Sequence, residues 1–156
     1  MAQAQASFSS ILDAPASDST RPPALPQGHY VFLVKGLPRK DKSTKKGTEY
    51  IEYTLALMEP YTNADNECDV DAEELASYGD YKGKERRLTF YMTEASAYRH
   101  TEFLENDLKV EIGGDSHWEA AQRTGGIQFI AQIRHKARED GKGVYDEIGN
   151  TAPLEA

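Results

Sequence analysis

Hydrophobic and polar residues alternate with a period of two in several short segments of this chain. The clearest is residues 50–58, in which every second side chain from Ile51 to Leu57 is large and apolar. Such alternation predicts a strand with one buried face. Alternation also predicts strands at residues 87–92 and 127–134. Residues 29–35 are predicted as a strand because they are rich in Val, Tyr and Phe, and residues 144–148 are predicted as the last strand.

Two segments between the third and fourth predicted strands carry helix signals instead. Residues 94–107 place apolar side chains at helical spacing, and Thr93, directly before them, is a residue type that favours the N-cap. Ser116 and Glu119 have the spacing of a capping box. This spacing predicts a second, short helix, which the glycines at 125–126 end.

Five strands with a helix between the third and fourth is the order of an OB fold. We therefore expect a mainly β domain over residues 28–150, built as a five-stranded OB-fold-like barrel. Residues 1–27 are rich in Ala, Ser, Gln and Pro and are expected to be a flexible arm, with 151–156 as a short tail. Residues 59–84 form an acidic insertion, which has seven acids and no base between positions 65 and 80.

The formal net charge is −8, yet basic residues concentrate in the loop between the first two predicted strands. In an OB fold the first and last hairpin loops flank the face that binds oligonucleotides. Lys and Arg side chains there neutralise phosphates. The first loop supplies six candidates for phosphate contact: Lys35, Arg39, Lys40, Lys42, Lys45 and Lys46. The last hairpin loop supplies three more: Lys136, Arg138 and Lys142.

Aromatic and polar side chains on the strands are candidates for contact with bases. Tyr50 and Tyr91 lie on the faces opposite the apolar rows of their strands, where an aromatic ring can stack on a base. Arg87 shares the face of Tyr91 and is a candidate for stacking or for a backbone contact. The fourth predicted strand adds three polar candidates on one face: Gln128, Gln132 and Arg134. Phe103 and Trp118 are predicted to belong to the core.

Several stretches of the chain carry a resemblance to a known family. They are G-H-Y-V-F-L-V-K-G at 28–36, K-K-G-T-E-Y-I-E-Y-T-L-A-L at 45–57, R-R-L-T-F-Y-M-T-E-A-S-A-Y-R-H-T-E-F-L at 86–104, G-G-I-Q-F-I-A-Q-I-R-H at 125–135 and G-K-G-V-Y-D-E-I at 141–148. These patterns resemble phage-encoded single-stranded-DNA-binding proteins of OB-like fold, which serve replication and recombination. The resemblance implies binding of single-stranded DNA with little sequence preference, and replication or recombination proteins as further partners.

The sequence carries no catalytic signature, since it lacks G-x-S-x-G, a Walker-type glycine-rich loop and H-E-x-x-H. We therefore predict a protein without enzymatic activity and without a cofactor. The single Cys68 and four scattered histidines lack the spacing of metal ligands. No apolar run approaches the about 20 residues that span a bilayer, so we expect no membrane partner and a cytoplasmic location, which would be the host cytoplasm for a viral protein.

Two other functions are compatible with the sequence. The same fold can serve as a protein-interaction module that engages a partner through the acidic residues 65–74. The many acids also permit a magnesium-dependent nuclease subunit, although no spacing selects a pair of ligands. The residues alone leave open the oligomeric state, the site size and the choice between DNA and RNA, and only the resemblance favours DNA.

Overall fold

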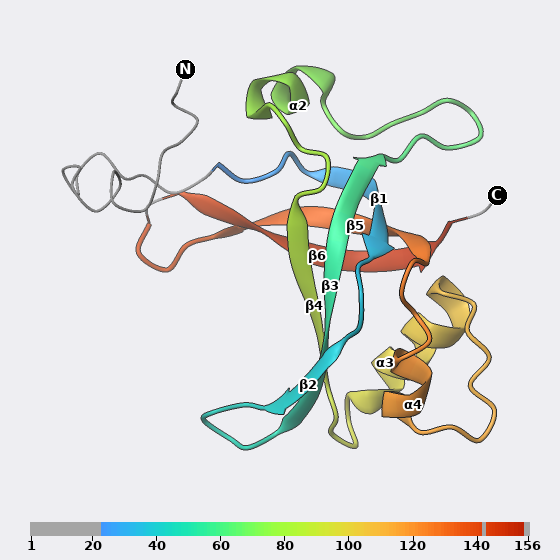
Figure 1. The fold of residues 1–156 in the computed structure, drawn as a ribbon. Coiled ribbons are helices and arrows are strands. Elements are labelled where there is room, and N and C mark those ends of the chain that lie inside the picture. Colours follow the sequence, from blue (N-terminus) through green and yellow to red (C-terminus); the bar gives the residue numbers. More distant parts are fainter. Residues whose placement is uncertain (1–22, 142, 155–156) are drawn as a thin grey trace, which may run out of the picture.

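The computed structural model describes residues 23–141 and 143–154 of the chain. Its six strands are β1 (Gly28–Val34), β2 (Arg39–Lys42), β3 (Glu49–Pro60), β4 (Glu85–Tyr91), β5 (Gln128–Ala137) and β6 (Val144–Pro153). Three short α-helices and one π-helical turn connect them: α2 (Ala72–Tyr78), α3 (Ala97–Glu102), η3 (Phe103–Asp107) and α4 (His117–Ala121). The protein is therefore mainly β, as predicted, with one strand more than the sequence indicated (Figure 1).

All strands join one antiparallel sheet that is organised around β3. Tyr50 of β3 pairs with both Asp41 of β2 and Tyr91 of β4, so β2 and β4 lie on opposite edges of β3. Leu55 of β3 pairs with Val34 of β1, opposite the same β4. It follows that β1 and β2 lie end to end along one edge of β3. The sheet continues from β1 to β5 and then to β6.

The predicted barrel is not closed. Within the described residues no hydrogen-bonded ladder joins β4 to β6, the two strands that would have to meet. A single ion pair links them instead, in which the Arg86 guanidinium on β4 contacts Asp146 on β6 with nitrogen–oxygen distances of 2.5 and 2.9 Å. The architecture is thus an open, curled six-stranded sheet with short helices at its ends.

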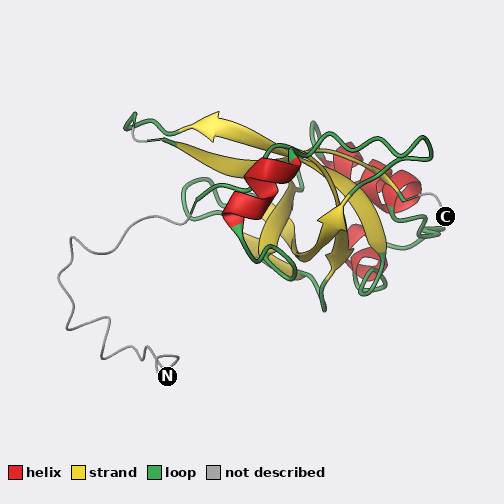
Figure 2. Cartoon of the chain, turned by 90° about the horizontal axis from the view of Figure 1, so that it is seen from above, coloured by secondary structure: helices red, strands yellow, loops and turns green. Residues whose placement is uncertain are grey.

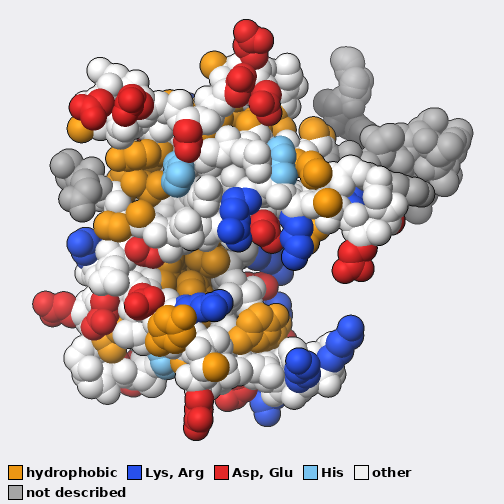
Figure 3. Space-filling view, turned by 180° about the vertical axis from the view of Figure 1, so that it is seen from behind, with side chains coloured by type: hydrophobic (Ala, Val, Ile, Leu, Met, Phe, Trp, Pro, Cys, Tyr) orange, Lys and Arg blue, Asp and Glu red, His pale blue; other side chains and the backbone are white. Residues whose placement is uncertain are grey.

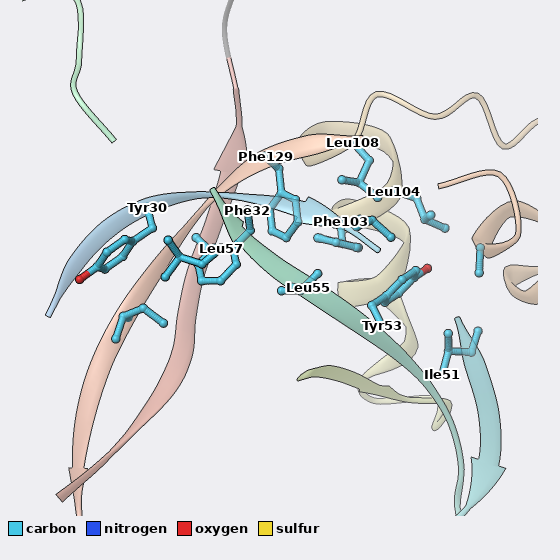
Figure 4. Close-up of a cluster of buried hydrophobic side chains, with 14 of the residues drawn as sticks. Tyr30, Phe32, Ile51, Tyr53, Leu55, Leu57, Phe103, Leu104, Leu108 and Phe129 are labelled. Carbon is cyan, nitrogen blue, oxygen red and sulfur yellow. The ribbon is translucent and has the colours of Figure 1, made fainter. Parts of the chain in front are cut away.

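The core lies on the inner face of this sheet (Figure 4). The alternation predicted for β3 is confirmed, because Ile51, Tyr53, Leu55 and Leu57 are all buried. Large side chains from β1, β5 and η3 complete the cluster, among them Tyr30, Phe32, Phe103, Leu104 and Phe129. Burial of each such side chain stabilises the fold by about 1.5–3 kcal/mol. It also fixes the register of the strands and therefore the positions of their outward-facing residues.

The helix predicted over 94–107 is shorter and less regular than expected. It begins at Ala97, with Ser96 rather than Thr93 as the N-cap, and the Thr93 hydroxyl accepts a hydrogen bond from the Ser96 N–H at 3.1 Å. From Phe103 the chain turns as a π-helix, in which the Leu108 N–H donates to the Phe103 carbonyl. The wider turn keeps both Phe103 and Leu104 buried against the sheet.

The capping box at α4 is confirmed. The Glu119 N–H donates to the Ser116 hydroxyl at 3.1 Å, and the Ser116 N–H donates to the Glu119 carboxylate at 2.9 Å. These two bonds satisfy donors that a helix start leaves without partners. The helix ends at Ala121, before the glycines that were expected to stop it.

A helix that the sequence did not predict lies within the acidic insertion. Asp71 caps α2 by accepting hydrogen bonds from the N–H groups of Glu73 and Glu74. Asp69 binds His29, with 2.6 Å between its carboxylate and the imidazole Nδ1, while Val70 between the two acids is buried. Part of the acidity therefore holds this insertion onto the sheet.

The packed part of the chain begins before Gly28, where the sequence suggested that the domain starts. Leu25 is fully buried, and its N–H donates to Asp146 at 2.8 Å. Its carbonyl lies 2.6 Å from His135 Nε2, and the Pro26 carbonyl accepts from the Tyr30 hydroxyl. The segment assigned to the arm thus contributes a strap across β6, and residues 1–22 of that arm lie outside the described residues.

Candidate nucleic-acid interface

The first basic loop is a hairpin that contains β2. Its turn closes on itself, since the Ser43 N–H donates to the Thr48 carbonyl and the Gly47 N–H donates to the Ser43 carbonyl. Gly47 has a φ of 66°, a conformation that glycine adopts without strain. The hairpin projects from the lower end of β3 in Figure 1. A basic hairpin loop was predicted here, and the structure adds a four-residue strand, β2, within it.

Strand pairing divides the six basic candidates of this hairpin into groups. Arg39 lies opposite Glu52, on the outer face of β3, whereas Lys40 lies opposite the buried Ile51 and so occupies the other face. Lys42 shares the side of Lys40, because successive strand residues alternate. Lys45 and Lys46 belong to the exposed turn. The hairpin therefore offers cations on both sides and at its tip.

Glu52 is the centre of the outer-face group, and the sequence analysis did not single it out. Its carboxylate lies 3.1 Å from Arg39 of β2 and 3.2 Å from Arg87 of β4, and it accepts a hydrogen bond from the Thr89 hydroxyl. The Glu52 side chain is only 15% exposed, while both arginines remain open to solvent. One carboxylate thus fixes two guanidinium groups that approach from opposite edges of β3.

Two tyrosines extend this group along the same face. Tyr50 and Tyr91 are directly paired across β3 and β4, with ring centroids 5.8 Å apart in an edge-to-face arrangement. The Arg39 guanidinium lies 5.7 Å from the Tyr50 centroid and donates to the Tyr50 hydroxyl at 3.1 Å. Tyr91 is 48% exposed. The face therefore presents an open aromatic surface bordered by two arginines, a combination suited to stacking bases.

The lysines of the hairpin differ from these arginines in having no acidic partner. Lys35 is the exception, because it forms an ion pair with Glu85 and thereby lowers the pKa of that carboxyl. Within residues 23–141 and 143–154, no ion pair involves the remaining four: Lys40, Lys42, Lys45 and Lys46. Unpaired ammonium groups keep their full charge available to a phosphate.

Two of the three polar candidates on β5 make contacts with β6 that the sequence did not predict. Gln128 is exposed and lies beside Leu33 on the outer face. Arg134 pairs with Glu147 of β6 at 3.3 Å, and Gln132 accepts a long hydrogen bond from Asn150. Both side chains cross β6 at Gly149, where a Cβ atom would come within 2.9 Å of each of them. Gln132 and Arg134 therefore help pack β5 on β6.

The second basic loop joins β5 to β6 in a hairpin that projects beyond the rest of the sheet (Figure 2). Lys136 lies opposite Tyr145, and the Arg138 guanidinium lies 5.8 Å from the centroid of the same ring. Arg138 also lies 4.0 Å from Asp140. Lys142, the last predicted residue of this loop, lies outside the described residues.

Charge is unevenly distributed over the face shown in Figure 3, although some acidic side chains also lie in its lower half. Acidic side chains gather at the upper end, where Figure 1 places α2, whereas Lys and Arg side chains lie across the middle and on the projecting hairpin below. The acidic residues 65–74 and the first hairpin therefore occupy opposite ends of the molecule.

Trp118 is a further residue that sequence reasoning did not place at a surface. It is half-buried and packs against the core, as expected, but Lys40 Nζ lies 4.8 Å from its ring centroid. Phe103, the other aromatic predicted for the core, is fully enclosed. No local sequence signal could have found the Trp118 contact, because it depends on how α4 packs beside β2.

The described residues contain no group of three or more His, Cys, Asp or Glu side chains placed to hold a metal ion. Cys68 is exposed and unbonded. His100 and His117 do approach each other, with 2.8 Å between their Nδ1 atoms, and His100 Nε2 lies 2.6 Å from the buried Tyr53 hydroxyl. Burial, followed by the neighbouring His117, lowers the pKa of His100 to about 4.

None of the described helices has the length and apolar character needed to cross a membrane. Comparison with protein-family models and with curated protein sequences finds no match for this chain. The functional assignment therefore depends on the geometry of the strand face and of the two hairpins.

Proposed function

We propose that this protein binds single-stranded DNA with little sequence preference, on the outer face of β3 and β4 and along the β2–β3 hairpin. The observation that carries the proposal is the juxtaposition on one face of Tyr50 and Tyr91 with Arg39 and Arg87, which Glu52 holds in place. Unpaired bases stack on such rings, and each stacked base contributes about 1–3 kcal/mol. Four unpaired lysines on the adjoining hairpin provide the charge that a phosphate backbone requires.

The strand pairing supports an OB-like arrangement. β1 pairs with β3 and β5, β3 pairs with β4, β5 pairs with β6, and the helices α3 and α4 fall between β4 and β5. With β2 taken as part of the first hairpin, β3 and β4 correspond to the second and third strands of an OB fold, whose face and flanking hairpins bind oligonucleotides. The Arg86–Asp146 ion pair stands where the partly open barrel would close.

An open tyrosine pair favours a single strand over a duplex, because the bases of a duplex are already stacked and their faces are covered. Stacking on a tyrosine ring tolerates any base, because every base has a π face. We therefore assign the face to sequence-tolerant coating of single strands, in agreement with the resemblance to phage single-stranded-DNA-binding proteins. The role in replication or recombination follows from that resemblance alone.

The test is fluorescence anisotropy of a labelled oligo-dT of roughly 30 nucleotides, long enough to exceed the about 4–16 nucleotides that one OB fold covers. Affinity is measured over a series of salt concentrations and with a duplex competitor. Each neutralised phosphate adds about −0.7 to the slope of log affinity against log salt, so the four unpaired lysines predict a slope near −3. Absence of binding at low salt, in a folded protein, refutes the proposal and directs attention to the acidic residues 65–74.

A pair of variants tests the stacking surface itself. We expect Tyr91→Leu to weaken binding by about 1–3 kcal/mol, whereas Tyr91→Phe keeps the ring and most of the affinity. Both variants should unfold at nearly the same temperature, because Tyr91 is half exposed at a strand end. Equal loss of affinity in the two variants would contradict stacking and would point to the hydroxyl group instead.

A further inference from the structure

A groove of about 550 Å³ lies between the β2–β3 hairpin and α4. Figure 1 shows the β2–β3 hairpin and α4, which supply its lining, in the lower part of the molecule. Six of its lining side chains carry the chemistry: Lys40, Lys42, Tyr50, Met92, His117 and Trp118. The groove lies on the inner side of the β2–β3 ribbon, the side of Lys40 and Ile51, whereas Tyr91 lies on the outer face. Tyr50 connects the two sites, because it lines the groove and forms the edge-to-face pair with Tyr91.

The α4 wall of this groove is anchored to the core. The capping box at Ser116 fixes the first turn of α4, which presents His117 and Trp118. His117 is further held through its 2.8 Å contact with His100, which is fully buried and itself contacts Tyr53. An aromatic side chain that is fixed in this way loses little conformational freedom when a ligand stacks on it.

The opposite wall supplies charge. Lys40 lies over the Trp118 ring, and Lys42 lies on the same side of β2. Two acids also line the groove, but Asp41 is engaged by Arg39 at 3.4 Å and by the Lys42 N–H at 2.8 Å. Glu49 lies directly opposite Lys42 and partly offsets its charge, so Lys40 is the principal cation at the ring.

We propose that this groove holds one nucleobase of the bound strand, stacked on the Trp118 indole, with the adjoining phosphate between Lys40 and Lys42. The Trp118 ring and the Met92 thioether can contact the flat face of a base, and the two ammonium groups can contact its phosphate. A ligand that is only apolar or only anionic would use just one of these features. Lys40 leaves the ring for the phosphate as the base enters. The inference deepens the proposed function and rests on it, since it extends the path of the strand from Tyr91 past Tyr50 to α4.

Trp118 is the only tryptophan in the chain, so its intrinsic fluorescence reports on this groove alone. We would titrate the full chain with unlabelled oligo-dT of roughly 30 nucleotides and follow Trp118 emission and its quenching by iodide. The anisotropy of a labelled copy of the same oligonucleotide is measured in parallel. We expect emission to fall with the same midpoint as the anisotropy change, and the bound strand to protect Trp118 from iodide several-fold.

The two measurements separate the two proposals. An anisotropy change with unaltered Trp118 emission and iodide access overturns the groove while leaving the proposed function intact. Absence of any anisotropy change at low salt overturns the proposed function and the groove with it. Substitution supplies an independent readout, because we expect Trp118→Leu to weaken oligonucleotide binding about tenfold and Trp118→Phe to retain most of it.

Lys40→Gln serves as the matched variant for the opposite wall. It removes the cation from above the ring without changing the ring. We expect a smaller salt slope, by about 0.7, with Trp118 quenching preserved. Wild-type affinity in a folded Trp118→Leu protein would refute the stacking site, even if the emission of the wild-type protein changes on binding.

Discussion

The two basic hairpins look alike in the sequence and differ in the structure. Residues 35–50 contain six bases and two acids, whereas residues 134–147 contain four of each. In the first hairpin Lys35 and Arg39 have acidic partners, and four lysines have none within the described residues. In the second, Arg134 and Arg138 lie beside Glu147 and Asp140, and among its described bases only Lys136 has no ion pair. A run of basic residues between two strands therefore does not by itself mark a phosphate site, and the local acids decide.

The second hairpin uses much of its charge to hold the fold together. Asp146 is 7% exposed and receives Arg86 from β4 together with the Leu25 N–H from the strap. Burial raises the pKa of Asp146, but the hydrogen bonds from Arg86 and Leu25 outweigh burial and lower it overall. This carboxylate joins β4, β6 and the segment before β1, so the base of the second hairpin is a structural junction.

The largest effect that separates the hairpins should be on stability. Arg86→Ala leaves Asp146 buried without its ion-pair partner, which we expect to lower the free energy of unfolding by about 3–5 kcal/mol. Urea denaturation followed by circular dichroism measures the loss. Arg134→Ala is the matched control, because its pair with Glu147 is largely exposed and should contribute less than about 1 kcal/mol. Equal losses in the two variants would contradict a structural role confined to the junction.

The second effect concerns pH and distinguishes the surroundings of the two hairpins. His100, behind the groove beside the first hairpin, has a pKa of about 4 when folded, below its ordinary 6.5. Between these values the unfolded chain binds a proton that the folded protein excludes, so stability is full above pH 6.5 and falls by about 3 kcal/mol towards pH 4. Asp146 has a lowered pKa, so its contribution is lost only below about pH 3.9.

Urea denaturation at several values between pH 7.5 and 4.5 measures the first of these windows. His100→Gln keeps polar atoms beside Tyr53 but cannot titrate, and it should flatten the dependence over this range. A variant that retained the full slope would show that other groups cause the fall in stability. In the wild-type protein Asp146 adds nothing to the slope above pH 5, because its lowered pKa keeps it ionised throughout that range.

The third effect is on binding and is expected only from the first hairpin. Lys42→Glu, Lys45→Glu and Lys46→Glu together remove three unpaired cations, each contributing about 1 kcal/mol at a phosphate in water. We expect affinity for oligo-dT to fall about a hundredfold with no change in the unfolding temperature. The matched triple variant of the second hairpin, Lys136→Glu, Arg138→Glu and Lys142→Glu, should lose less than about tenfold. Anisotropy at one fixed salt concentration compares them, and a reversed order would exchange the roles of the hairpins.

The sequence predicted those parts of the fold whose signals are local. The alternation in β3 and the capping box at Ser116 were read correctly, because each depends on neighbours within a few residues. β2 was missed, since its four residues are all charged and exposed and it becomes a strand only by pairing with β3. α2 was missed because its acidic residues dominate the segment and only Leu75 and Tyr78 pack against the core, although Asp71 was an available cap signal.

The candidate site divides in the same way. The alternation of side chains along each strand correctly predicted the face that Tyr50 and Tyr91 occupy. Their direct pairing depends on the register between β3 and β4, which the sequence does not show. Glu52 and Trp118 were not singled out for the interface, because their roles arise from side chains that lie far away in the sequence. Arg39 and Arg87, which meet at Glu52, are separated by more than one complete strand of the chain.

The position of β2 at the margin of the sheet has a consequence for solubility. An edge strand offers unpaired backbone groups to which another chain can add, and natural proteins discourage this with charged side chains. Every residue of β2 is charged and exposed, and no strand in the described part of the chain covers its outer edge. The charges that would attract a nucleic acid to β2 therefore also discourage another copy of the chain from pairing with this edge. Glutamate substitutions should preserve this protection, whereas apolar ones should abolish it.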